Sequence, residues 1–147
     1  MSTRTEAERT QVVRATSQDH LRLYVDSDGK EGYTLRGVPC LILTTVGRRT
    51  GEARSVPLIF GQDGENYLLV ASLGGATHHP TWYLNLRDNP AVQIQVKDRH
   101  MAGRARTATG EERTRLWDLM VEVFPTYASY QARTEREIPV VVVEPVR

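Results

Sequence analysis

A series of strand-sized apolar stretches joined by short turns is the feature that most restricts how this chain can fold. Residues 38–46, 53–60 and 66–72 are rich in apolar and β-branched residues, and the segments GRRTGE and GQDGEN that join them contain glycine. Such runs, separated by glycine-containing turns, predict consecutive β-hairpins. Residues 91–97 and 100–108 alternate between apolar and polar residues and predict a further hairpin. The chain is therefore expected to form a largely antiparallel sheet.

Helical patterns flank these strands. The most regular pattern begins at Thr109, which stands three residues before Glu112 as in a capping box. Shorter helices are predicted around Trp82 and after Pro125, and the polar stretch that ends near Asp26 predicts an amphipathic N-terminal helix. The last apolar run, IPVVVVEPV, shows no alternation and predicts a closing strand that is covered on both faces.

Together these elements predict an α+β fold. About six strands, mostly antiparallel and connected as hairpins, would curl towards a small barrel with helices against it. We expect residues 1–147 to form a single domain, with a helical segment over 1–26 and the barrel body over 38–147. Pro57 cannot donate a hydrogen bond, so its strand is expected at an edge or a bulge. The sequence contains neither GxGxxG nor GxxxxGK[ST], which excludes the two commonest nucleotide-binding folds.

Charge and cysteine content exclude further classes. The 19 basic and 18 acidic residues leave a formal net charge of +1, which gives no support for nucleic-acid binding, so an anion site must be a local cluster. The single cysteine, Cys40, excludes an internal disulfide and is expected to be inert packing. The first residues, MSTRTEAERT, lack the apolar core of a signal peptide. We therefore expect a cytoplasmic protein whose N-terminal helix makes only weak contact with a membrane.

The first candidate site is a cluster of three arginines at one hairpin tip. Arg48, Arg49 and Arg54 lie in and just after the turn, and their guanidinium groups offer fixed pairs of donors to phosphate or carboxylate. The Thr50 hydroxyl and the amides beside the turn glycines would complete an anion cradle. The alternative is that basic residues at an exposed hairpin tip only discourage pairing between sheet edges.

The second candidate site is the segment VASLGGATHHP. Here a strand that ends near Ser72 leads into two glycines, which allow backbone amides to approach a flat ligand, although a plain glycine turn explains the same pattern. His78 and His79 are adjacent and point apart, and His20 and His100 show no ligand spacing, so no metal site is predicted. We expect His79 to serve at the entry to the following helix.

The third candidate site is aromatic. Tyr127 and Tyr130 are three residues apart and share a helix face, from which two phenols can stack on a planar ligand and donate a proton. A stripe of aromatic residues is more often simply core. That alternative fits Trp82 and Trp117 better than the two tyrosines, which stand in a polar segment.

Three ordered blocks resemble a known family. LILTTVGRRTGEARSVPLIF, YLLVASLGGATHHPTWYLNLRDNP and YASYQARTEREIPVVVVEP are similar to the deazaflavin-dependent nitroreductases, the F420-dependent reductases typical of actinobacteria. The resemblance runs over about residues 26–145. It implies a split β-barrel related to the FMN-binding split barrels, with coenzyme F420 in a groove. It also implies hydride transfer from reduced F420 to an electron-poor acceptor such as a quinone or a nitroaromatic compound.

The resemblance also implies which residues hold the coenzyme. Arg48, Arg49 and Arg54 would hold the phosphate and the glutamate tail of F420. Trp82 and Asn85 match positions near the coenzyme in the family. The residues that would line the deazaflavin ring are Ser55, Val56, Pro57, Ala71, Ser72 and Leu73.

On the acceptor side, Tyr127 matches a tyrosine that faces substrate and is the leading donor or orienting group. Tyr130 and Ser72 are the further catalytic candidates. Two departures from the family pattern occur. Leu73 stands where some members carry a lysine, and Phe124 stands where well-studied members have a tyrosine. The first departure removes one cationic contact to the coenzyme. Together the two are compatible with coenzyme binding and argue against reduction of nitroimidazole prodrugs.

Two alternatives remain at this stage. The same barrel could bind FMN as an oxidoreductase, although several arginines suit the long anionic tail of F420 better. A non-catalytic coenzyme carrier, or an interaction domain with basic tips, is the other alternative. The partner of the main hypothesis is a small-molecule hydride acceptor, and an exposed sheet edge is compatible with a monomer or a homodimer.

Overall fold

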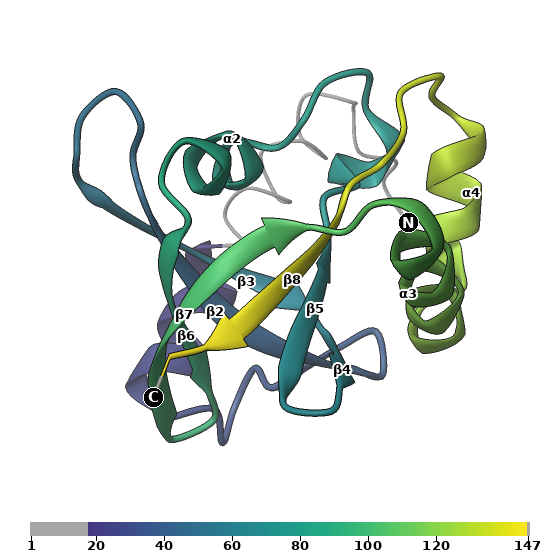
Figure 1. The fold of residues 1–147 in the computed structure, drawn as a ribbon. Coiled ribbons are helices and arrows are strands. Elements are labelled where there is room, and N and C mark those ends of the chain that lie inside the picture. Colours follow the sequence, from purple (N-terminus) through teal and green to yellow (C-terminus); the bar gives the residue numbers. More distant parts are fainter. Residues whose placement is uncertain (1–17, 147) are drawn as a thin grey trace, which may run out of the picture.

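The structure is a computed structural model that describes residues 18–146, and in this part of the chain eight strands form one curled antiparallel sheet (Figure 1). Residues 18–26 are helical. The strands are β1 (Thr34–Leu35), β2 (Val38–Val46), β3 (Ala53–Ile59), β4 (Gly61–Asp63), β5 (Asn66–Val70), β6 (Ala91–Val96), β7 (Arg99–Thr107) and β8 (Val140–Pro145). The remaining helical elements are η1 (Leu73–Gly75), α2 (Thr81–Asp88), α3 (Gly110–Val123) and α4 (Thr126–Ala132).

An open seam runs along one side of the sheet. The strands follow the order β1-β2-β6-β7-β8-β5-β4, and β3 pairs with the other edge of β2. Within residues 18–146, β3 pairs with no other strand, so its outer edge faces β5 without a hydrogen-bonded ladder. Pro57 lies in β3, opposite Ile42 of β2, which confirms the edge position expected for a residue without an N–H group.

The main core fills the inside of the curled sheet. Leu41 and Leu43 of β2, Leu69 of β5 and Val141 of β8 point into it, and Tyr83 of α2 closes one end. Alternation along each strand directs every second side chain to this core. Helix α2 therefore closes one end of the barrel, and the short helix predicted around Trp82 is confirmed over Thr81–Asp88.

Two further apolar layers cover the outer faces of the sheet. Leu68 of β5 and Val142 of β8 pack with Leu116 and Met120 of α3, while Cys40 and its neighbour Ile42 on β2 pack against Tyr24 of the N-terminal helix. Figure 1 shows α3 and α4 together beside β5 and β8. Both faces of β2 and β8 are thus buried, which accounts for their unbroken apolar runs.

Two short strands were not predicted, so the described residues contain eight strands and not six; of these two, β4 lies in the predicted turn GQDGEN. β1 forms only two residue pairs and lies upstream of the predicted body boundary at residue 38. β4 begins at Gly61, where an added Cβ would come within 2.5 Å of the Met120 sulfur. Gly61 therefore allows β4 to pack closely against the Met120 side chain of α3, although in the sequence it indicates a turn.

The predicted capping box at the start of α3 is wrong. Thr109 occupies the N-cap position with extended backbone, but its side chain makes no capping hydrogen bond. The Glu112 carboxylate accepts a bidentate pair of hydrogen bonds from Arg106 of β7 instead, one of them 3.0 Å long. This tertiary ion pair ties α3 to the sheet and competes with the local cap.

Parts of the predicted architecture at the N-terminus lie outside the described residues. Residues 18–26 of the helical segment predicted over 1–26 are helical, and residues 1–17 lie outside the described part of the chain. No helix within residues 18–146 is long and apolar enough to span a membrane.

The turn after β5 has an unusual backbone. Leu73, Gly74 and Gly75 have φ values of 45°, 64° and 82°, three consecutive left-handed residues. A Cβ at Gly75 would come within 2.6 Å of the backbone oxygen of Tyr130 in α4. Only glycine therefore allows η1 to lie directly against α4.

We predict that Gly75→Ala destabilises the fold by about 3 kcal/mol or more, because it combines a left-handed backbone with a clash against α4. Gly64→Ala is the matched control: Gly64 has a φ of 62°, but a Cβ there would meet nothing within 4 Å. Its cost should be only about 1 kcal/mol. Urea denaturation of both variants measures the difference, and equal costs would rule out the close contact between η1 and α4.

Candidate functional site

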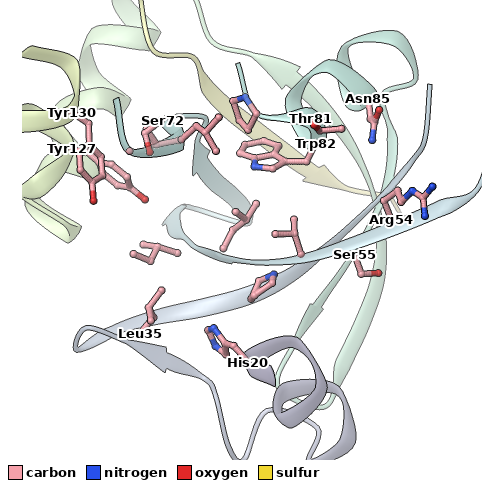
Figure 2. Close-up of a pocket in the computed structure, with 18 of the residues that line it drawn as sticks. His20, Leu35, Arg54, Ser55, Ser72, Thr81, Trp82, Asn85, Tyr127 and Tyr130 are labelled. Carbon is pink, nitrogen blue, oxygen red and sulfur yellow. The ribbon is translucent and has the colours of Figure 1, made fainter. Parts of the chain in front are cut away.

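The seam between β3 and β5 contains a cavity of about 800 Å³. Its walls come from the β2–β3 hairpin tip, β3, the turn after β5, the start of α2, and α4. His20 and Leu35, from the N-terminal part of the described chain, also line it. Figure 2 shows Arg54 and Asn85 at one end of this cavity and Tyr127 and Tyr130 at the opposite end. The cavity is thus elongated, with different chemistry at its two ends.

The first end is cationic. The four residues predicted to hold an anion, Arg48, Arg49, Thr50 and Arg54, all line the cavity, and all four are exposed. Arg54 makes an ion pair of 3.3 Å with Glu52, and both side chains are more than half exposed. An exposed pair of this kind contributes little free energy, so the Arg54 guanidinium remains available to an anionic ligand.

The hairpin tip that carries these arginines is fixed by Asn85 of α2. The Asn85 side-chain oxygen accepts a hydrogen bond of 3.1 Å from the backbone N–H of Arg48, and its amide nitrogen donates one of 3.2 Å to the Thr45 hydroxyl. Asn85 is only 2% exposed, so both bonds are shielded from water. Asn85 lines the cavity, and the structure shows it as the anchor of the arginine cluster.

The middle of the cavity is mostly apolar. Ser55, Val56 and Pro57 of β3 form one wall, and Ser72, Leu73 and Trp82 lie across the cavity from them. Leu73 is 48% exposed although it is a large apolar residue, which is the arrangement of a contact surface. Ala71, also predicted to touch the coenzyme, is fully buried in the barrel core and does not line the cavity.

The second end carries two phenols on α4, which confirms that Tyr127 and Tyr130 share a face. Their ring centroids are 6.3 Å apart, and the Phe124 ring lies 5.0 Å from that of Tyr127. Both tyrosines line the cavity, with their hydroxyl groups extending away from α4 (Figure 2). Burial raises the pKa of Tyr127 above its ordinary value, so its hydroxyl is a weaker acid than an exposed phenol.

The expected division between core and site aromatics holds only in part, because Tyr127 is both buried and part of the cavity wall, and Trp82 lines the cavity as well. Tyr127 is 5% exposed, whereas Trp82 and Trp117 are only half-buried. Trp82 lines the cavity, and Trp117 packs under the guanidinium of Arg113 at 5.1 Å. The polar sequence around Tyr127 is misleading because α4 buries one face against α3 and exposes the other.

Cys40 and the histidines offer neither a nucleophile nor a metal site among the described residues. Cys40 is fully buried, and burial raises the pKa of its thiol to about 11, so it is protonated at neutral pH. Residues 18–146 contain no group of three or more His, Cys, Asp or Glu side chains arranged to hold a metal ion. His79 directly precedes Pro80, the N-cap residue of α2, in keeping with the expected role at the helix entry.

Sequence reasoning missed residues that reach the cavity from a distance. His20 of the N-terminal helix and Leu35 of β1 line it, with the His20 ring nitrogen 2.6 Å from the Gly32 carbonyl. Arg136 was also missed, although its guanidinium binds the backbone of the turn after β5. No local pattern marks these residues, since each comes into place only through the tertiary fold.

Comparisons with known proteins agree with this site. Residues 16–145 match the family described as F420H(2)-dependent quinone reductase. The chain is 38% identical over 127 residues to an F420H(2)-dependent quinone reductase of Mycobacterium tuberculosis, a match that covers 84% of this chain and 85% of the relative.

Two solved structures share the fold. One, described as an F420-H2 dependent reductase, is 44% identical with a TM-score of 0.68, and the match covers 72% of this chain and 94% of that one. Another, described as a domain-swapped dimer, is 39% identical with a TM-score of 0.71, and the match covers 92% of this chain and 99% of that one. These similarities confirm the predicted split barrel. Because the family match extends over most of its length, this chain belongs to the F420H(2)-dependent quinone reductase family.

Proposed function

We propose that this protein transfers a hydride from reduced coenzyme F420 to a quinone. The observation that carries the proposal is a single elongated cavity with a cluster of guanidinium groups at one end and two phenols at the other. The family match supports the same coenzyme and acceptor class. The alternative coenzyme FMN is set aside, because the family is described by F420H(2).

The cationic and apolar parts of the cavity suit the chemical groups of F420. F420 combines a flat deazaflavin ring with a phosphate and a glutamate tail, so it needs a cationic region separated from an apolar slot. Arg48, Arg49 and Arg54 supply the first, since guanidinium binds phosphate and carboxylate in a bidentate manner. The β3 wall and the turn after β5 supply the second.

We assign the coenzyme contacts on this basis. The hairpin tip would hold the anionic tail, with the Thr50 hydroxyl as an additional donor. Ser55, Val56 and Pro57 would support one face of the ring, and Ser72 and Leu73 the opposite side, beside Trp82. Reduced F420, when bound, supplies the hydride and both electrons for the reduction.

Tyr127 is the residue best placed to act on the acceptor. Reduction of a quinone to a hydroquinone consumes one hydride and one proton, so negative charge develops on a quinone oxygen until that proton arrives. Because burial raises the pKa of Tyr127, its hydroxyl is a poor acid but a permanent hydrogen-bond donor. Tyr127 would thus orient the quinone oxygen and stabilise its charge, while Tyr130 and Ser72 serve as neighbouring polar groups.

The acceptor end favours apolar quinones over nitro compounds. Phe124 lines the cavity next to Tyr127 and offers no hydrogen-bond donor. Well-studied family members have a tyrosine at this position, so this chain lacks one hydrogen-bond donor that a polar nitro group could use. Nitroaromatic compounds would therefore be secondary acceptors.

Association and location remain predictions. The outer edges of β3 and β4 carry no strand partner within residues 18–146, which is compatible with a monomer or a homodimer. The neighbour described as a domain-swapped dimer supports the second option. A cytoplasmic location, with weak contact between the N-terminal segment and a membrane, continues as a sequence-based prediction.

Removing the arginines should weaken coenzyme binding and flatten its salt dependence. We expect Arg54→Ala to raise the Kd for reduced F420 several-fold and the Arg48, Arg49 and Arg54 triple alanine variant to raise it at least about tenfold, without loss of folding stability. Isothermal titration at two salt concentrations measures both effects. Arg104→Ala, which removes an exposed guanidinium from β7 outside the cavity, is the control. Wild-type affinity in the triple variant would disprove anchoring of the tail by this cluster.

Loss of the Tyr127 hydroxyl should affect turnover more than binding. We expect Tyr127→Phe to lower kcat with a quinone by about 10- to 100-fold, because a hydrogen bond made mainly in the transition state is removed. The Kd for F420 should change less than about twofold. Tyr67→Phe removes a hydroxyl from a tyrosine buried in the barrel core outside the cavity, and it should leave kcat unchanged. An unaltered kcat in Tyr127→Phe would exclude the assigned role.

A further inference from the structure

Arg136 uses its whole guanidinium group to hold two walls of the cavity together. Its Nε donates to the Ala76 carbonyl at 2.7 Å, and Nη2 donates to the Ser72 carbonyl at 2.7 Å. Both Nη atoms lie 3.3 Å from the Ala71 carbonyl, and Nη1 lies 3.1 Å from His79 Nδ1. A guanidinium has five N–H donors, so these five bonds satisfy all of them.

The backbone around Arg136 is itself fixed. The Gln131 side chain of α4 donates from Nε2 to the Arg136 carbonyl at 2.8 Å and accepts from the Ile138 N–H at 2.9 Å. No ion pair joins Arg136 to a carboxylate of a described residue. The guanidinium therefore binds backbone carbonyls and one histidine, and it forms no surface ion pair with a described residue.

The three carbonyls belong to the turn that shapes the middle of the cavity. This turn contains the left-handed residues Leu73 and Gly74, which line the cavity, and Leu73 pays a conformational cost for its φ of 45°. Such a backbone persists only where surrounding contacts enforce it. Arg136 supplies these contacts from behind the wall, since it does not itself line the cavity.

We propose that Arg136 is a positioning residue for coenzyme binding: it locks the turn after β5 in its left-handed form and ties it, through His79, to the start of α2. This inference rests on the proposed function, because the locked turn and Trp82 of α2 form the walls assigned to the deazaflavin ring. A lysine cannot replace this arginine, because one ammonium group lacks the planar fork that reaches carbonyls on both sides.

The contacts of Arg136 with the turn after β5 and with His79 are called the clamp below. The hydrogen bond between Arg136 and His79 makes this clamp dependent on pH. His79 Nδ1 can accept from Arg136 only while the imidazole is neutral. The cations that face His79 are Arg136 and Arg87 of α2, and its ring also packs on Tyr83 at 4.8 Å. Protonation would place a second positive charge about 3 Å from the guanidinium and turn the acceptor into a donor.

The lowered pKa of His79 sets the direction of this pH dependence. Burial, then Arg136, then Arg87 lower the pKa of His79 below its ordinary value of about 6.5. The folded protein therefore holds His79 neutral, and that contribution to stability is complete above about pH 6.5 and is lost as the pH falls through the folded pKa. The clamp should loosen on the acid side.

The first test compares Arg136→Lys with Arg104→Lys in the free protein and in coenzyme binding. We expect Arg136→Lys to raise backbone hydrogen exchange in residues 71–76 and to weaken F420 binding by roughly tenfold, while α3 keeps its protection. Arg104→Lys should change neither quantity. Wild-type exchange in residues 71–76 together with wild-type Kd in Arg136→Lys would overturn the proposal.

The second test uses His79→Asn, whose side-chain oxygen takes the place of Nδ1 as an acceptor but does not titrate. Between about pH 7.5 and about pH 5.5, wild-type protein should show rising exchange in residues 71–76 and weaker F420 binding. His79→Asn should show a smaller change in both. An identical acid response in the two proteins would overturn the role of His79, and this outcome stays readable even if Arg136 variants fold poorly.

These readouts separate the clamp from the proposed function. If wild-type protein binds no F420, the proposed function fails, and the exchange of residues 71–76 alone still decides whether Arg136 locks the turn. If F420 binds normally to Arg136→Lys while exchange rises, the turn is locked by Arg136 but the lock is irrelevant to the coenzyme, which overturns the positioning role.

Discussion

The missing ladder between β3 and β5 is the constraint on which the rest of the structure depends. A closed barrel would fill this space with hydrogen bonds and side chains, whereas the open seam leaves room for a cavity of about 800 Å³. Pro57 helps to keep β3 at an edge, because it offers no N–H to a further strand. α2 and α4 then flank the seam, so the opening becomes an elongated site and not an exposed sheet edge.

Different interactions shape the two ends of the site. Asn85 fixes the arginine end through backbone and hydroxyl contacts, so that exposed guanidinium groups stand on an ordered tip. At the tyrosine end, burial raises the pKa of Tyr127, so its hydroxyl is a weak acid that remains a hydrogen-bond donor. Flexible cations suit a tail that arrives from solvent, while a fixed phenol suits a reacting oxygen that must be oriented. The chemistry of hydride transfer resides in the coenzyme, and the protein contributes position and charge.

The sequence predicted the fold class and most of the cavity, and the reasons for its failures are physical. Alternation and turn glycines predicted the hairpins, and the ordered blocks around Arg48, Ser72 and Tyr127 supplied residues that line one cavity. Gly61 was misleading because its role is close packing against α3. Ala71 faces the core, although Val70 and Ser72 on either side of it line the cavity, because neighbouring residues of an extended segment point to opposite faces. Arg136 acts across the fold, and no local pattern encodes such a contact.

A crystal structure of the protein with F420 bound tests the central claim most directly. The account predicts that the glutamate tail and phosphate lie within hydrogen-bond distance of Arg48, Arg49 and Arg54. It also predicts that the deazaflavin ring lies between the β3 wall and the turn after β5, with its reactive edge open towards Tyr127. A tail that extends into solvent, or a ring bound outside the seam, would contradict it.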